Sequence, residues 1–83
     1  MRTWLFYKAT PVENGIRVAF RRVDPDGCIS TYLPDEIRDP VVLSDKGDLD
    51  RQVQARVRSS GWVGDRAHPA DSGVAQVVLK GRW

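Results

Sequence analysis

The clearest pattern in the chain is an alternation of apolar residues with basic or small ones. It covers positions 16–21, where Ile16, Val18 and Phe20 alternate with Arg17, Ala19 and Arg21. A period of two predicts a strand with one face in water. Residues 3–9 mix aromatic and β-branched types and predict an earlier strand. The Asn14-Gly15 pair between them supplies the positive φ angles of a hairpin turn.

A third strand is expected over residues 29–33, where Ile29, Thr31 and Leu33 alternate with smaller or polar residues. Residues 25–27, Pro-Asp-Gly, form a turn signal before it. The first half of the chain therefore predicts a three-stranded antiparallel meander. Residues 34–40 begin and end with proline and cannot continue a central strand, while residues 41–43 fit a short strand or a buried connector.

One helix is expected in the second half. Leu49, Val53 and Val57 recur at intervals of four, which places them on one helix face. Asp45 or Asp48 can cap its start. We expect Gly61 to close the helix and Trp62 to fold back onto its apolar stripe.

Residues 63–73 are rich in turn formers and predict a surface loop, and residues 74–79 predict a final strand. The expected order is β-β-β-α-β, a single α+β domain over residues 1–83 with the helix packed on one face of a four-stranded sheet. The last strand can pair beside the first or beside the third, and the sequence does not decide between them.

The composition bears on the cellular location of the protein and on its association with membranes. A single cysteine, Cys28, excludes an internal disulfide framework and favours the cytoplasm. No apolar run approaches the length of a membrane span, so we expect no membrane association. Monomer and homodimer both remain open.

Candidate catalytic groups are sparse. His68, Asp71 and Ser72 carry the letters of a hydrolytic triad, but triad members normally come from separate elements. Asp24 and Asp35 have the spacing of a calcium loop, yet Cys28 occupies a position that needs an oxygen ligand. We therefore expect no enzyme, no cofactor and no metal.

Basic residues are the better candidates for function. If the helix covers the Ile16 side of the sheet, Arg17 and Arg21 point to the other face, where Lys8 or Tyr7 can join them. Arginine and tyrosine are frequent anchors at protein interfaces. The expected contacts with a protein partner are Arg17, Arg21, Tyr32, Arg82 and Trp83. Trp83 fits either a core position or an exposed anchor.

Binding of nucleic acid is the alternative. It would use arginines from the second strand and the helix: Arg17, Arg21, Arg22, Arg51 and Arg58. The net charge of only +2 argues against it, because nucleic-acid affinity usually rests on a strongly basic footprint.

The sequence thus predicts a small non-enzymatic protein-interaction module. Ten of its thirteen basic residues are Arg, a bias typical of GC-rich genomes. Small chains of this kind without catalytic residues are typical of phage or mobile-element inhibitors that dock on a host complex, anti-CRISPR proteins among them. Size and composition accordingly favour an inhibitor that docks on such a complex, with anti-CRISPR-like activity as one example.

Overall fold

The fold is built on one long hairpin. The computed structural model describes residues 3–24, 29–30, 32–64 and 66–70. Strands β1 (Trp4–Val12) and β2 (Gly15–Val23) pair antiparallel along their full lengths, with Tyr7 opposite Phe20. The predicted hairpin is confirmed, and both strands are longer than the alternating pattern indicates.

Gly15 begins β2 under two constraints that only glycine meets. Its φ is +152°, a value that side chains rarely allow, and a Cβ atom there would collide with the carbonyl oxygen of Leu43. The glycine therefore closes the turn and also lets the next strand approach the hairpin.

Two short strands share the outer edge of β2. Strand β4 (Val41–Leu43) pairs with residues 16–18, and β3 (Ile29–Ser30) pairs with Arg22 and Val23, both antiparallel. The meander is thus present, and residues 41–43 are a strand. The third strand was expected over residues 29–33, and the described part of it is shorter.

The chain leaves the sheet at Tyr32. This side chain is 81% exposed, its carbonyl oxygen accepts a 3.1 Å hydrogen bond from Arg22 Nη1, and Leu33 turns into the core. Pro34 then starts a one-turn helix, α1 (Asp35–Arg38), which is braced by an ion pair between its ends, Arg38 and Asp35, at 2.8 Å. The sequence did not predict α1, because a single turn is too short to carry a helical period.

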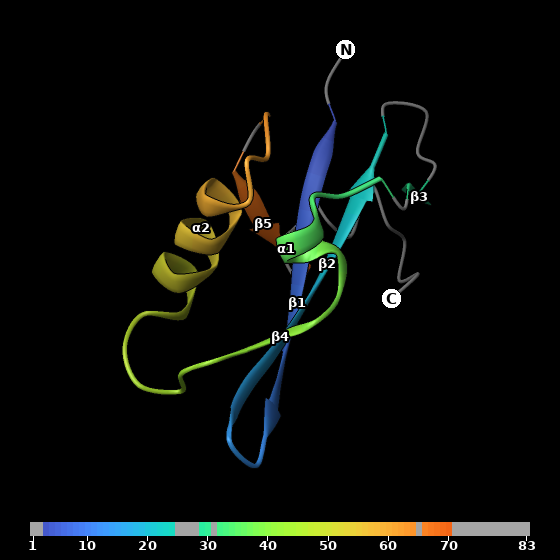
Figure 1. Cartoon of the computed structure of the whole chain (residues 1–83). Coiled ribbons are helices and arrows are strands. Elements are labelled where there is room, and N and C mark those ends of the chain that lie inside the picture. Colours follow the sequence, from blue (N-terminus) through green and yellow to red (C-terminus); the bar gives the residue numbers. More distant parts are fainter. Residues whose placement is uncertain (1–2, 25–28, 31, 65, 71–83) are drawn as a thin grey trace.

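The predicted helix is confirmed as α2 (Leu49–Ser59). Asp48 caps it, since its Oδ1 accepts a 3.1 Å hydrogen bond from the Arg51 backbone N–H. Gly61, with a φ of +83°, follows its end, and Trp62 packs partly buried against the core as expected. Figure 1 shows α2 lying alongside the sheet next to β5.

The expected loop over residues 63–73 is wrong in its middle. Ala67–Pro69 forms β5, which pairs parallel with β1 through Leu5, Phe6 and Tyr7. A three-residue strand that depends on distant partners leaves no local period to read. The sheet is therefore mixed, in the order β3-β2-β1-β5 with β4 also on β2. The predicted strand at residues 74–79 lies outside the described residues.

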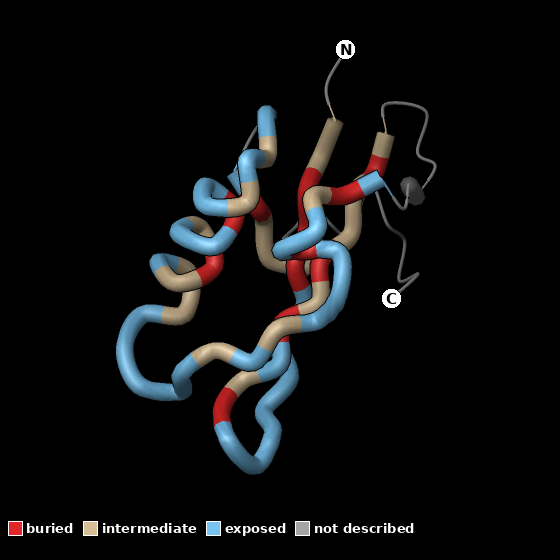
Figure 2. Tube along the Cα trace, viewed as in Figure 1, coloured by how far each residue is buried: buried red, intermediate tan, exposed pale blue. Residues whose placement is uncertain are grey.

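The fold class is α+β, with the main core on one sheet face. Leu5, Tyr7, Val18 and Phe20 of the hairpin pack against both helices and β5. The contributions from outside the hairpin are Leu33, Ile37, Val53, Val57 and Ala67. Figure 2 shows this buried layer between α2 and the upper part of the hairpin, so the opposite sheet face is the one that can carry a site.

Candidate interaction surface

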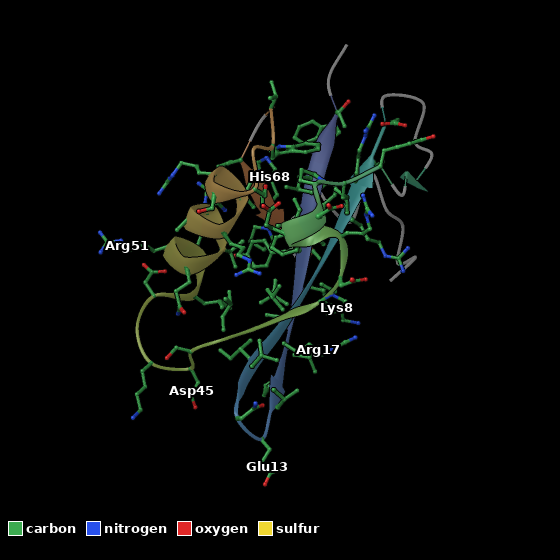
Figure 3. The ribbon with its side chains drawn as sticks, viewed as in Figure 1. Lys8, Glu13, Arg17, Asp45, Arg51 and His68 are labelled. Carbon is green, nitrogen blue, oxygen red and sulfur yellow. The ribbon has the colours of Figure 1, made fainter. Side chains whose placement is uncertain are left out.

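The sheet face turned away from α2 carries basic side chains. Because side chains alternate along a strand, Arg17 and Arg21 lie opposite the core residues Val18 and Phe20. The register places Lys8 on the same face, one pair along from Arg17. Figure 3 shows Lys8 and Arg17 extending from the same side of the hairpin. The predicted exposure of Arg17 is confirmed, whereas Arg21 is half-buried.

Thr10 and Val42 complete this surface. Both pair with Arg17, one on each side of it, and therefore point to the same face. Val42 is 49% exposed and Thr10 is exposed. Lys8, Thr10, Arg17 and Val42 are called the basic hairpin face below.

The charges of Lys8 and Arg17 have no partner among the residues that the structure describes. Neither the Lys8 nor the Arg17 side chain forms an ion pair or hydrogen bond within the described part of the chain. Other arginines there are neutralised, as in the Arg22–Asp24 pair at 2.9 Å and the Arg66–Asp50 pair at 2.6 Å. Among the described strand residues, every ionisable side chain placed on this face is a base.

The basic hairpin face lies on a segment that projects from the core. Residues 8–14 are all exposed, and Figure 2 shows the lower hairpin extending beyond both helices. The turn and strand ladder hold the segment in shape, while α2 covers none of it. The result is a rigid and accessible surface.

The other end of the same sheet face is closed. Phe6 and Val23 are fully buried although they point away from α2. Trp4 stacks near Phe6 at 6.2 Å between ring centroids, and His68 meets the Trp4 ring edge-on at 5.4 Å. His68 is thus a half-buried member of an aromatic cluster in a strand, and the surface loop expected over residues 63–73 is wrong at this position.

The arginines of the nucleic-acid alternative do not share one surface. Arg51 and Arg58 lie on the outer side of α2, opposite the buried Val53, whereas Arg17 lies on the far side of the sheet. Figure 3 shows Arg51 and Arg17 on opposite sides of the molecule.

Arg22 is also separated from Arg17. It points to the helix side of the sheet, where it contacts Asp24 and the Tyr32 carbonyl oxygen. The Tyr32 carbonyl oxygen therefore lies beside the Arg22 side chain. Arg82 and Trp83 lie outside the described residues.

A polar cluster on the helix side was missed by the sequence reasoning. Asp50 Oδ1 accepts hydrogen bonds from the Tyr7 hydroxyl at 3.0 Å and Gln54 Nε2 at 3.2 Å, and Asp50 Oδ2 accepts one from Arg66 at 2.6 Å. Burial raises the pKa of Asp50, but these hydrogen bonds and the Arg66 charge outweigh it and hold the pKa below 3.8. The i,i+4 spacing of Asp50 and Gln54 was the available signal.

Gln54 connects this cluster to the backbone of β5. Its amide donates to the Ala67 carbonyl oxygen at 2.7 Å and accepts from the Ala67 N–H at 3.0 Å. Gln52 pairs in the same way with the backbone of Ser44, at 3.0 and 3.1 Å. The two glutamines therefore tie α2 to β5 and to the segment after β4.

The described residues contain no group of three or more side chains of the metal-binding types His, Cys, Asp and Glu. Asp71 and Ser72, named with His68 as a possible triad, and Cys28 lie outside the described residues. Within the same residues no helix is long and apolar enough to cross a membrane. Comparison with known protein families, curated proteins and solved structures found no match to this chain.

Proposed function

We propose that this chain is a non-enzymatic interaction module that binds an acidic protein surface through its basic hairpin face. One observation carries the proposal: Lys8 and Arg17 are exposed, lack partners among the described residues and lie on a sheet face without described carboxylates. A complementary acidic surface would be steered toward this face and held in one orientation. Val42, which is exposed beside Arg17, adds apolar contact area.

A protein partner fits this surface better than nucleic acid does. A nucleic-acid site usually extends over several phosphates or offers exposed aromatic rings for stacking. Here Arg51 and Arg58 lie on the opposite side of the molecule, and the ring of Phe6 is buried. The basic hairpin face is small and well suited to a few charge pairs around a small apolar contact.

The proposed biological role is inhibition of the partner by occupation of its acidic surface. A rigid hairpin that projects from an anchored core can reach into a recess of a larger complex. This role includes the anti-CRISPR-like activity expected from size and composition.

Affinity capture from a bacterial lysate with three tagged proteins tests the proposal. The proteins are the natural chain, Arg17→Glu and Arg51→Glu, each used with and without nuclease. Arg17 and Arg51 are both exposed, and neither side chain has an ion pair in the described structure, so the two variants carry equal charge changes on opposite sides. We expect one discrete protein that survives nuclease, is retained by Arg51→Glu and is lost from Arg17→Glu.

Two results would contradict the proposal. Equal retention of the captured protein by both variants would remove the basic hairpin face from the contact. Recovery of nucleic acid, with all captured proteins lost after nuclease, would instead support the nucleic-acid alternative.

A further inference from the structure

We propose that the partner contributes an extended acidic segment, which adds as a strand to the edge of β1 over residues 8–12. This inference rests on the proposed function, because it specifies how an acidic partner engages the basic hairpin face. It goes beyond charge attraction by assigning main-chain hydrogen bonds to the contact.

The first support is the shape of the β1 edge. β5 pairs with Leu5, Phe6 and Tyr7 and ends at Pro69. Beyond Tyr7, the described residues place no strand along the edge of β1 that faces away from β2, and residues 8–12 are all exposed. An extended segment would continue the row that β5 begins.

The second support is the direction of the backbone groups. The Ala70 N–H donates to the Tyr7 carbonyl oxygen at 2.8 Å, so the Tyr7 main chain faces away from β2. Main-chain groups of an antiparallel pair alternate in direction, which turns those of Ala9 and Pro11 to the same side. Within the described residues, this edge therefore offers three main-chain groups without a strand partner: the Ala9 N–H, the Ala9 carbonyl and the Pro11 carbonyl.

Proline limits the length of the added strand. Pro11 has no N–H to donate. Its main chain faces away from β2, so the missing N–H does not interrupt the hydrogen bonds between β1 and β2. Pairing can therefore continue for only a few residues, up to the turn at Glu13. This favours a short peptide segment over an open-ended sheet.

Charge specifies the occupant. A residue opposite Lys8 on the added strand would lie about 5 Å from it between Cβ atoms. Arg17 is one strand further away, but only the small Thr10 lies between, so its long side chain can also reach the added strand. Acidic side chains would thus point to the basic hairpin face.

The same charges argue against a second copy of this chain. Two copies paired through the β1 edge would bring Lys8 and Arg17 of each copy onto one continuous face. Like charges placed opposite one another destabilise strand pairing. The edge is thus suited to an acidic segment of another protein.

An NMR titration of the full chain tests the inference with a capped peptide of sequence Asp-Val-Asp-Val-Asp. We expect resonance changes concentrated at residues 8–12 and hydrogen exchange of the Ala9 amide slowed at least about tenfold by the peptide. The same peptide with lysine in place of aspartate should not bind. An absence of binding at millimolar peptide, or an Ala9 amide that stays unprotected, would overturn strand addition.

Ala9→Pro separates the main-chain contact from the charge. The proline removes the Ala9 N–H, which faces the added strand, just as Pro11 lacks one on the same side of β1. We expect this change to weaken peptide binding at least about tenfold. Ala9→Ser keeps the N–H and should bind as the natural chain does. The Ala9 exchange measurement decides the question even if Ala9→Pro does not fold.

The two proposals fail in different ways. If Ala9→Pro retains the captured protein and Arg17→Glu loses it, strand addition is wrong and the proposed function stands. If Arg17→Glu retains that protein, the proposed function is wrong, and the acidic character assigned to the added strand is wrong with it.

Discussion

The two halves of β1 belong to one continuous strand but have different surroundings. Leu5, Phe6 and Tyr7 are buried on both faces, between the helix-side core and the aromatic cluster with Trp4 and His68. Residues 8–12 are exposed on both faces, although their pairing with β2 is unbroken. Residues 5–7 of β1 are therefore packed into the core and are called the anchored half below. Residues 8–12 extend away from the core and are called the projecting half.

The difference shows how an 83-residue chain can present the proposed binding surface outside its core. A small domain buries a limited fraction of its surface, and its core supplies little stability to spare. Here the core contacts of β1 lie in the anchored half, so substitutions in the projecting half should change few packing contacts. We expect stability and binding to separate along β1.

The largest expected effect compares Phe6→Ala with Val12→Ala. Phe6 is fully buried, and its truncation should lower the free energy of unfolding by about 3–5 kcal/mol. Val12 is 36% exposed, and its truncation should cost at most about 0.5 kcal/mol. Urea denaturation of both variants measures this. Similar losses at the two positions would show that the projecting half is also part of the stabilising core.

A smaller effect compares the two glutamines of α2. Gln54→Ala leaves the N–H and carbonyl of the buried Ala67 without their side-chain partner, which should cost about 1–3 kcal/mol. Gln52→Ala leaves Ser44 exposed to water, so the loss should be at most about 1 kcal/mol. Urea denaturation of the two variants measures both losses, and hydrogen exchange of the Ala67 N–H reports the Gln54 contact separately. Equal losses would mean that burial of Ala67 adds nothing to this contact.

The smallest effect concerns acid. The pKa of Asp50 is lowered in the folded chain, so its contribution to stability is present above the unfolded pKa, near 4. It is lost as the pH falls from about 4 through the folded pKa, because the unfolded chain then binds the proton first. Urea denaturation between pH 6 and pH 2.5 should show a shallower decline for Asp50→Asn than for the natural chain. Parallel curves would contradict this assignment.

The hairpin and α2 could be predicted from sequence because their signals are local. The alternation around Val18 gave the strand and its wet face, and the spacing of Leu49, Val53 and Val57 gave the helix. β5 and α1 could not be found in this way. β5 is held by contacts with β1 and with the Gln54 amide, which are distant from it in sequence. The 4 residues of α1 are too few to show a helical period.

The candidate surface was predicted in part. The alternation correctly placed Arg17 on the open face, while Lys8 and Tyr7 remained alternatives because the hairpin register was unknown. The register places Lys8 there and buries Tyr7 on the helix side. Tyr32 stays a predicted contact: its side chain is exposed, and its carbonyl oxygen accepts a hydrogen bond from Arg22.

The paired glutamines also bear on how this sequence can vary. Both recognise main-chain groups, so the glutamine contacts themselves depend on backbone shape and not on the side chains at positions 44 and 67. The Ser44 hydroxyl also accepts a 3.0 Å hydrogen bond from the Lys46 N–H, so position 44 keeps a preference of its own for a short acceptor side chain. A functional library of this chain would then show its strictest polar requirement at position 54 of α2, and weaker ones at positions 52 and 44.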